Sequence, residues 1–414
     1  MRIRYAVPLL TIAAAPAAHA SVVAVGTCLP SATSVSTIQG AVSISAAGGT
    51  VKVCPGTYPE QIVITKNLTL EGISDGVNST QAVIVPPSTG VVATNGIAAQ
   101  IFAENAAKVT VENLTVDGTG TTGNGITGCG PYIIGIYYLN ASGTIKANLV
   151  QNQVLNSPSL IGCQNGLGIF VDSSGGSSNV SVQSNVVENY QKNGITANDV
   201  GTNATITGNT VQGQGPTTGA AENSIQVGFG ATATISSNIV GGDIWAMDTS
   251  SDTGDAAAGI LVYASTGVSV TSNTVESTQY GISFSGNSMD GAADGGTVSD
   301  NKVGATFIFD GVDICANNAS VTRNTIVGSV ESAIHADSSC FGASTGDSIS
   351  GNKINGACAG ILEGVGSTPT LGTNTFVNTA NNILSGTDAC PVPGPDARRP
   401  GHAAARPHAV RLRH

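Results

Sequence analysis

A ten-residue pattern recurs along most of the chain and restricts its fold more than any other feature. Copies read "ATITGNTVQG" (204–213), "ATISSNIVGG" (233–242), "VSVTSNTVES" (268–277) and "ASVTRNTIVG" (319–328). Each copy is a short alternating strand, one Asn and a second short strand, and a third strand such as "NGITAND" (193–199) follows before the next copy. A coil of three short strands cannot bury its own apolar face. The pattern therefore predicts coils that stack on one another as a solenoid, with insertions looping outward.

One Asn stands at the centre of every copy. We place these repeat asparagines at positions 152, 185, 209, 238, 273, 301, 324, 352 and 374. Asn tolerates left-handed backbone angles and bonds to its own turn, so we expect it at a tight bend. Stacked from coil to coil, the side chains can form an Asn ladder that satisfies buried amides. We therefore assign the repeat asparagines a structural role.

The first part of the chain differs from the repeats and carries a family resemblance. Residues 36–72 begin with a short helical pattern and continue as strands. The words "TIQGAV", "PGTYPE" and "NLTLEG" resemble the N-terminal cap of pectin-lyase-like right-handed parallel β-helix proteins, including pectin methylesterases and the periplasmic nitrous-oxide-reductase accessory family. The resemblance covers most of residues 36–385. It implies an all-β, single-stranded right-handed parallel β-helix with a short N-terminal helical cap, which keeps the first coil from exposing a raw edge.

We expect a signal peptide over residues 1–20, one β-helix domain over residues 21–390 and a disordered basic tail over residues 391–414. Within the domain, the cap spans residues 28–72 and the coils span about 80–385. Arg2 and Arg4 start the signal, an apolar stretch follows, and "AHA" (18–20) fits a cleavage site. No later stretch is long and apolar enough to span a bilayer.

The cysteines agree with export. There are eight, with no CxxC pair, and His335 is the only His of the folded body, which disfavours a zinc site. An even number of cysteines in an exported chain indicates disulfides, and sequence neighbours such as Cys28 and Cys54 are plausible partners. We expect a secreted, periplasmic or cell-surface protein that is a monomer.

Charge is distributed unevenly along the chain. Residues 21–395 hold eight basic residues against 25 acidic ones, whereas the tail holds five Arg. An acidic body with one Arg does not suit nucleic-acid binding, because phosphates require dense Lys and Arg. The sequence therefore excludes a nucleic-acid partner of the usual kind.

Two neighbouring coils bring acidic residues and the body histidine together. In each third strand the aliphatic residue after the Gly points inward, so residues two and four places after the Gly point outward. Strands about 4.8 Å apart then form straight rows of equivalent residues. This register places Asp313 beside His335 and Asp310 near Glu331, with Asp337 on the same patch. Crowded acids raise one another's pKa, which can yield a general acid and a base or nucleophile at neutral pH.

The segment "FDGVD" (309–313) resembles the "TDGID" segment of polygalacturonase-type glycosidases, whose catalytic acids occur at the start of this strand. The double Asp, Gly-His-Gly and Arg-x-Lys motifs of that family are absent here. If the protein is an enzyme, Asp310 and Glu331 are the candidate acid/base pair. An exposed polar strip without chemistry, or a Ca²⁺ site formed by the carboxylates, are the open alternatives. The sequence assigns no cofactor with certainty.

A second group combines Tyr190, Lys192 and Glu222 as candidate substrate-binding residues. A Lys or Tyr that faces carboxylates could abstract a proton from a uronate, while an exposed Lys192–Glu222 ion pair is the plainer alternative. Trp245 in a long polar insertion could stack on a sugar or anchor its loop. Tyr263, which stands four places after the Gly of its third strand and so points outward, completes the set of candidate substrate-binding residues.

The acidic insertion that holds Trp245 also offers a weak Ca²⁺ candidate. It carries four acids whose spacing does not match the EF-hand pattern: Asp243, Asp248, Asp252 and Asp255. Long loops along one face are how such scaffolds build a groove for an extended polymer.

The sequence as a whole predicts an exported β-helix protein that binds or processes an extracellular polysaccharide along an outer face, with a uronate-rich polymer as one candidate. As an enzyme it would be a glycoside hydrolase or a lyase- or epimerase-like protein. The alternative is a non-catalytic periplasmic or surface β-helix that binds a partner through the same face.

Overall fold

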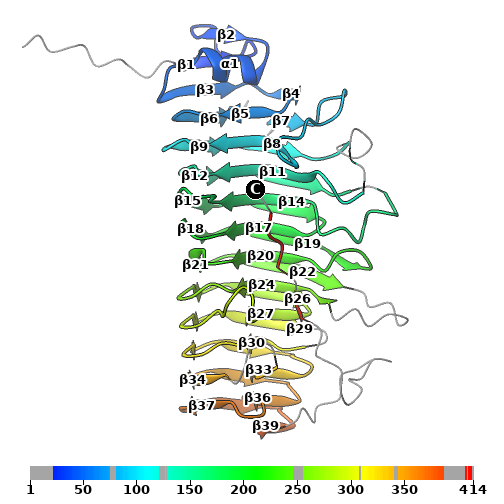
Figure 1. Cartoon of the computed structure of the whole chain (residues 1–414), viewed down its shortest axis with the longest axis vertical. Helices are drawn as coiled ribbons and strands as arrows, with labels where there is room; N and C mark the ends of the chain where they lie inside the picture. Colours follow the sequence, from blue (N-terminus) through cyan, green and yellow to red (C-terminus); the bar gives the residue numbers. More distant parts are fainter. Residues whose placement is uncertain are drawn as a thin grey trace, which may run out of the picture.

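The chain folds into one long column of stacked coils, capped at its N-terminal end (Figure 1). The structure, a computed structural model, describes residues 22–74, 81–120, 126, 128–155, 157–245, 255–306, 309–339, 344–386, 406–407 and 409–412 of the 414-residue chain. The expected signal peptide lies outside the described residues. No helix among the described residues is long and apolar enough to cross a membrane.

Three parallel sheets form the sides of the column, and each coil contributes one strand to each sheet. Sheet A consists, in spatial order, of β2 (Thr33–Val35), β1 (Val22–Val25), β3 (Gly49–Val53), β6 (Leu68–Gly72), β9 (Val109–Glu112), β12 (Gly143–Lys146), β15 (Ser178–Gln183), β18 (Thr202–Thr207), β21 (Thr232–Ser236), β25 (Ser269–Thr271), β28 (Thr297–Ser299), β31 (Ser320–Thr322), β34 (Thr345–Ser350) and β37 (Thr368–Leu371).

Sheet B follows sheet A within each coil. Its strands are β4 (Gly56–Pro59), β7 (Ala82–Val85), β10 (Leu114–Asp117), β13 (Leu149–Gln153), β16 (Val186–Tyr190), β19 (Thr210–Thr217), β22 (Ile239–Trp245), β26 (Thr274–Thr278), β29 (Lys302–Thr306), β32 (Thr325–Val327), β35 (Lys353–Asn355) and β38 (Thr375–Val377).

Sheet C closes each coil. Its strands are β5 (Ile62–Ile64), β8 (Ile97–Glu104), β11 (Tyr132–Leu139), β14 (Leu167–Asp172), β17 (Asn193–Asn198), β20 (Asn223–Gly228), β24 (Ala258–Tyr263), β27 (Tyr280–Ser285), β30 (Val312–Ile314), β33 (Ser332–Ala336), β36 (Ala359–Glu363) and β39 (Asn381–Ser385). The predicted all-β parallel β-helix is therefore confirmed.

The N-terminal cap contains a short helix, as the sequence predicts. Helix α1 (Ile38–Ile44) begins after Thr37, whose hydroxyl accepts a hydrogen bond from the Gly40 amide at 3.2 Å. The Glu60 carboxylate accepts the Ile38 and Gln39 amides at 2.9 Å, so an acid neutralises the positive end of the helix. The Cys28–Cys54 disulfide joins the cap to β3 and its turn.

The disulfides connect sequence neighbours, as expected from the cysteine pattern. Cys129 is bonded to Cys163, while Cys315 and Cys358 are each disulfide-bonded as well. Cys340 and Cys390 lie outside the described residues. Disulfide bonds indicate that the protein folds in an oxidising compartment.

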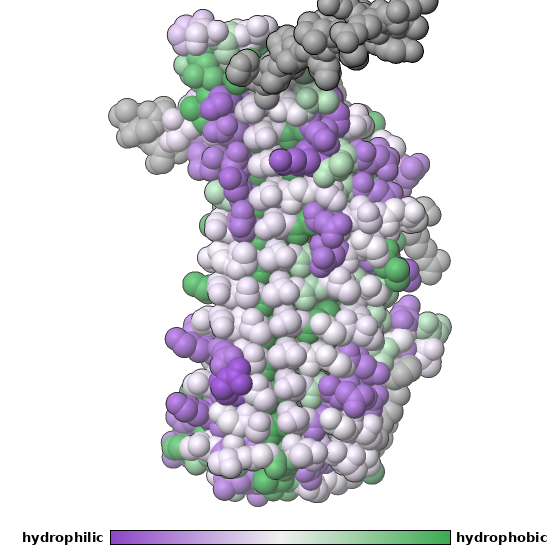
Figure 2. Space-filling model, turned by 90° about the vertical axis from the view of Figure 1, so that its left-hand side faces the viewer, coloured by the Kyte–Doolittle hydropathy of each residue, from purple (hydrophilic) through white to green (hydrophobic). Residues whose placement is uncertain are grey.

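The outside of the column is mostly neutral in hydropathy. Figure 2 shows one long face as regular rows of residues of intermediate hydropathy, with hydrophilic residues in scattered groups. This agrees with a composition of 10% charged residues and 54 glycines. Small hydroxyl and amide side chains fill the outward positions of many strands, as in β18 and β21.

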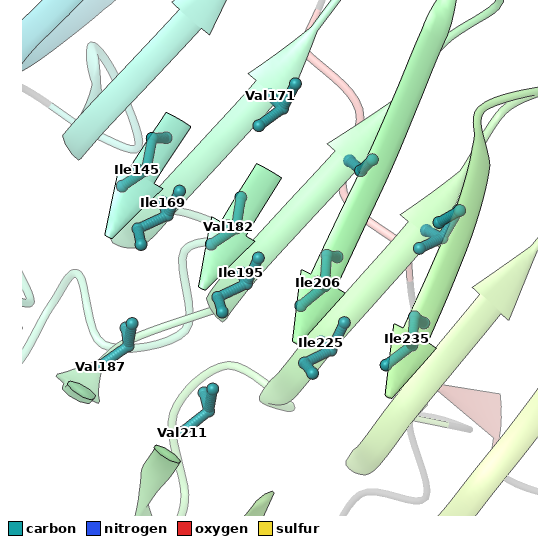
Figure 3. Packing of buried hydrophobic residues seen from close by; sticks show 14 of the residues in the cluster. Ile145, Ile169, Val171, Val182, Val187, Ile195, Ile206, Val211, Ile225 and Ile235 are labelled. Carbon is teal, nitrogen blue, oxygen red and sulfur yellow. The ribbon is translucent and has the colours of Figure 1, made fainter. Parts of the chain in front are cut away.

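The interior is a continuous stack of aliphatic side chains. Figure 3 shows Ile169, Ile195 and Ile225 in one row, with Ile145 and Val187 from the other two sheets facing them. The row continues in register through β24, β27, β30, β33 and β36. The third-strand aliphatic residues therefore point inward, as predicted. Each fully buried aliphatic side chain contributes about 1.5–3 kcal/mol.

The predicted Asn ladder exists, with two corrections. Each ladder Asn donates its side-chain amide to the Oδ1 of the next, from Asn148 through Asn185, Asn209 and onward to Asn374, at 2.9–3.0 Å. The first member is Asn148, so the assignment to Asn152 was wrong. Asn152 lies within β13 and donates instead to Asp117.

The second correction concerns the backbone. The left-handed angle belongs to the residue before the ladder Asn, as at Ser184 (φ 54°), Ser237 (φ 57°) and Arg323 (φ 56°). The ladder Asn keeps ordinary angles because its side chain must point into the turn. There its amide also reaches a carbonyl of the preceding coil, such as Ile145 for Asn185 at 2.9 Å.

Within the tail that the sequence predicts to be disordered (391–414), the structure describes residues 406–407 and 409–412. Strand β40 (Arg406–Pro407) pairs with β23 (Asp255–Ala256), far from it in sequence. Residues 409–412 then continue toward the N-terminal end of the column, and the trace that leads to the label C in Figure 1 crosses sheet C. Val410 and Leu412 are buried against that sheet. At least this part of the tail has a fixed place on the fold.

Asn238→Ala tests the ladder. Alanine removes the Oδ1 that accepts the main-chain and side-chain amides of Asn209, at 2.9 Å each, and leaves both donors buried. We expect the free energy of unfolding to fall by about 2–4 kcal/mol, measured by urea denaturation. Asn203→Ala is the control, because the hydrogen bonds of exposed Asn203 with Asn179 and Thr232 lie on the surface. Equal losses in the two variants would contradict a ladder that stabilises the fold.

Candidate functional site

Asp313 and His335 lie side by side on adjacent strands of sheet C. Asp313 in β30 and His335 in β33 are partners in the strand register, as the sequence predicts. Their neighbours Val312 and Ile334 point into the core, so both polar side chains point to the outer side of the sheet.

Hydrogen bonds tie these residues into one cluster. His335 Nδ1 lies 3.2 Å from Asp310 Oδ2 and 3.9 Å from Asp337 Oδ2. Asp310 Oδ1 accepts the amide of Ser332 at 3.2 Å and also its hydroxyl. The Ser283 hydroxyl donates to Asp313 Oδ2 at 2.9 Å. We call Asp310, Asp313, His335 and Asp337 the histidine cluster.

The cluster is not the solvated strip that the plainer sequence alternative describes. His335 is 6% exposed, and the three acids are buried as well. Burial alone lowers the pKa of His335, but the charges of Asp310 and Asp337, with the Asp310 hydrogen bond and Asp313, outweigh it and raise the pKa to about 9. The imidazole is therefore protonated at neutral pH and is held by carboxylates.

Glu331 is close to this cluster in the chain. It is buried and directly precedes Ser332, which donates to Asp310. Its carbonyl oxygen accepts the Ala359 amide at 3.0 Å. The hydrogen-bonded pair in the structure is Asp310 with His335, so we take this pair rather than Asp310 with Glu331 as the centre of the site.

The cluster also offers ligands for a metal ion. Asp310, Asp313 and His335 each offer one ligand atom, and these three atoms lie within 4.8 Å of one another. Two carboxylates and an imidazole suit a divalent transition ion better than Ca²⁺, which prefers oxygen ligands alone. The sequence also offered a Ca²⁺ candidate in the acidic insertion. Asp243 of this insertion binds other side chains, as described below. Asp248 and Asp252 lie outside the described residues.

The second candidate group is buried, not exposed. Tyr190, Lys192 and Glu222 lie inside the turns between sheets B and C, so the exposed Lys192–Glu222 ion pair is wrong. The Lys192 amine donates to the Ala221 carbonyl, and Glu222 Oε2 accepts the Gln214 amide at 3.0 Å.

Two residues that the sequence did not place here complete this group. The Tyr190 hydroxyl donates to Asp243 Oδ1 at 2.8 Å, and the Ser224 hydroxyl donates to Asp243 Oδ2 at 2.5 Å. The sequence offered Asp243 only as one of four candidate Ca²⁺ ligands in the acidic insertion. Asp243 lies in β22, beside β19, at a point where the pairing of these strands shifts, so a regular register does not place it. We call Tyr190, Lys192, Glu222, Ser224 and Asp243 the tyrosine cluster.

The two acids of the tyrosine cluster have raised pKa values. Burial raises the pKa of Asp243 to about 8, against the opposing hydrogen bonds of Ser224 and Tyr190. Burial and the charge of Asp243 raise the pKa of Glu222 to about 9. The same two causes, in that order, raise the pKa of Tyr190 well above its usual value. At neutral pH this cluster therefore holds protonated acids, whereas the histidine cluster holds a charged imidazole.

Trp245 and Tyr263 have different settings. Trp245 ends β22, is 7% exposed and packs against Ala221 and Ala257, and its indole donates to the Gly219 carbonyl at 3.0 Å. This is the loop-anchor arrangement rather than an open sugar platform. Tyr263 is half-buried and donates to Asp290 at 3.1 Å.

Parts of the chain match known families. Residues 89–242 match the family described as a right-handed beta helix region, and residues 247–389 match the family described as periplasmic copper-binding protein (NosD). No curated protein matches the sequence.

Solved β-helix structures share the fold. The Azotobacter vinelandii mannuronan C-5 epimerase AlgE4 A-module is 15% identical, covers 86% of this chain and 96% of that chain, and has a TM-score of 0.57. The Dettilon tailspike protein is 15% identical, with 84% and 64% coverage and a TM-score of 0.58. The Yersinia enterocolitica family 28 exopolygalacturonase is 12% identical, with 91% and 80% coverage and a TM-score of 0.52. At these identities the likeness shows the fold.

The copper in one family description does not fit the histidine cluster. Copper(I) prefers soft sulfur ligands. The cluster supplies one imidazole, already hydrogen-bonded to Asp310, and the nearby Cys315 is in a disulfide. We therefore derive no chemistry through copper here.

Asp243→Asn tests the protonated state of the tyrosine cluster. An unfolded Asp titrates near pH 4, so between about pH 4 and 8 the folded protein retains a proton that the unfolded chain loses. The free energy of unfolding therefore falls as the pH rises through this range. Asn resembles the protonated acid, so we expect Asp243→Asn to reduce this fall, measured as the unfolding midpoint in urea at pH 5 and pH 8.

Asp300→Asn is the matched control. Arg323 holds the pKa of the exposed Asp300 below its usual value. Asp300 is therefore ionised in both the folded and the unfolded chain between pH 5 and 8, so its contribution to the free energy of unfolding does not change over this range. An unchanged pH dependence in Asp243→Asn would contradict a buried neutral acid.

Proposed function

We propose that this chain, a right-handed parallel β-helix, binds an extracellular polysaccharide along the outer side of sheet C and hydrolyses it at the histidine cluster. The observation that carries the proposal is the buried Asp310–His335 pair with Asp313 beside it, on adjacent strands. Structural neighbours named as an epimerase and a polygalacturonase support a carbohydrate role for this fold. The disulfides agree with an extracellular or periplasmic place.

The geometry suggests a role for each member. Asp310 is a positioning residue that fixes the ring of His335 through Nδ1. The opposite ring nitrogen, Nε2, would donate its proton to the leaving glycosidic oxygen as the C–O bond breaks. Asp313, oriented by Ser283, would take a proton from the attacking water, whose oxygen forms the new bond to the anomeric carbon. The proton balance closes when His335 and Asp313 exchange protons with solvent.

Charge favours a neutral glycan over a uronate. The histidine cluster gathers three carboxyl groups around one imidazolium, so a substrate carboxylate would meet net negative charge. A uronate-rich substrate, as the sequence suggested, would need a bridging cation. The non-catalytic alternative is supported by the small exposure of the cluster and predicts binding without turnover.

Asp313→Asn and His335→Gln test the assignment on a panel of neutral and uronate polysaccharides. Reducing-sugar release reports hydrolysis, and absorbance of unsaturated uronates reports lyase chemistry. We expect each variant to lower kcat/KM on a neutral glycan by about 10²–10⁴-fold. Asp300→Asn, an acid-to-amide change on the exposed surface, should leave activity unchanged. Full activity in Asp313→Asn would remove the site, and no turnover of any polymer by the wild type would favour the binder.

The pH profile gives an independent test. Because the pKa of His335 is raised to about 9, the acid form persists through neutral pH. We expect kcat/KM to fall above about pH 9. A fall in kcat/KM that begins near pH 7 would contradict the assignment.

The ion pairs of His335 also contribute to stability. They stabilise the fold most below the unfolded pKa of about 6.5, and this contribution disappears as the pH rises through 9.

A further inference from the structure

The outward side chains of sheet C form one straight row that includes the histidine cluster. Strand register connects seven residues, each the partner of the next: Phe170, Thr196, Gln226, Leu261, Ser283, Asp313 and His335. We call these residues the outer row. A polymer that lies along the column at the histidine cluster would follow this row.

The C-terminal segment Ala409–Leu412 lies over the N-terminal half of the outer row. The Val410 amide donates to Gln226 Oε1 at 2.9 Å, and the Val410 carbonyl accepts Gln226 Nε2 at 2.8 Å and Asn198 Nδ2 at 2.7 Å. Two side-chain amides therefore bind both main-chain polar groups of Val410.

The residues on either side of this peptide hold the segment further. Leu412 and Val410 pack in one apolar cluster with Tyr137 and Phe170, and Ala409 packs with Leu261. Arg411 forms an ion pair with Asp199 at 2.5 Å and lies 4.9 Å from the centre of the Phe229 ring.

The surface beneath the segment has the chemistry of a sugar-binding strip. Phe102, Tyr137 and Phe170 stack on successive strands, with ring centres 5.1 and 5.3 Å apart. Next to them, Asn193 donates to Gln226 at 2.9 Å and Gln226 donates to Asn198 at 2.9 Å. The rings cover one another's faces, so they add apolar edges to the strip, and the amides beside them can both donate to and accept from hydroxyl groups.

One side of the segment is open to solvent. Arg411 remains 49% exposed in its ion pair. A cavity of about 750 Å³ lies beside the segment and is lined by Asp199, Phe229 and Asp290 together with Arg411 and Leu412. A ligand can therefore approach the strip from the edge of the segment.

We propose that the N-terminal half of the outer row is a glycan-binding subsite, and that the C-terminal segment Ala409–Leu412 occupies it as a tethered competitor. The inference rests on the proposed function, because it assigns the same polymer to both halves of the row. The amide groups of Gln226 and Asn198, which now bind the Val410 peptide, would bind sugar hydroxyls when the segment leaves. The segment thus limits access until a polymer or a change in ionic conditions displaces it.

The test uses the full-length chain with the segment weakened by Arg411→Glu and Leu412→Asp together. Arg323→Glu is the matched control, because Arg323 also forms an ion pair with one exposed Asp, on a different part of the column. Hydrogen–deuterium exchange of residues 223–230 and 409–412 reports release of the segment. Affinity electrophoresis through gels that contain each polysaccharide of the panel reports binding, and a synthetic peptide of residues 406–414 is added as a competitor in trans.

We expect faster exchange in the double variant and at least 10-fold tighter retention by the glycan that the wild type recognises weakly. The peptide should reverse that retention, and 0.5 M salt should weaken the Arg411 ion pair and shift the wild type toward the variant. The Arg323→Glu control should behave as the wild type.

Two results would overturn the inference while leaving the proposed function intact: unchanged exchange in the double variant, or faster exchange with unchanged glycan retention and normal turnover. Faster exchange with no retention or turnover of any glycan by any variant would overturn the proposed function, and the subsite with it. The exchange measurement separates these cases, since it detects the segment without any glycan.

Discussion

The structure depends on a fixed register between coils, and the asparagine ladder is the interaction that enforces it at every turn. Each ladder side chain joins the main chain of the coil before it to the amide of the coil after it, as Asn209 does with Val182 and Asn238. A slip of one residue would place an aliphatic side chain at the outer surface and a polar one in the core. Because the ladder forbids that slip, equivalent residues stay aligned over many coils.

That alignment turns a repetitive scaffold into a place for chemistry. Asp313 meets His335 only because β30 and β33 pair without offset. The same rule stacks Phe102, Tyr137 and Phe170 into one set of parallel rings. A β-helix thus collects side chains from distant parts of the sequence into straight rows, which suit an extended ligand better than a compact one.

The two buried polar clusters respond to burial in opposite ways. In the histidine cluster, several carboxylates surround one base, so their charges outweigh desolvation and keep the imidazole protonated. In the tyrosine cluster, two acids lie close together with hydroxyl donors, so desolvation favours their neutral forms. One cluster is therefore suited to proton transfer at neutral pH, and the other to holding sheets B and C together with its acids protonated.

The sequence by itself determined the coil, the inward aliphatic row, the cap helix and the Asp313–His335 pairing, because each follows from local periodicity and strand register. It misplaced the first ladder residue, since Asn148 and Asn152 both fit the pattern and only the turn geometry distinguishes them. It also could not show that Tyr190 and Asp243 meet, because that contact depends on a shift in the pairing of β19 with β22. Tertiary structure alone decided what covers the N-terminal half of the outer row. Val410 binds Asn198 and Gln226, which lie 212 and 184 residues before it in the chain. No periodic pattern in the sequence relates a C-terminal tail to the face on which it folds back.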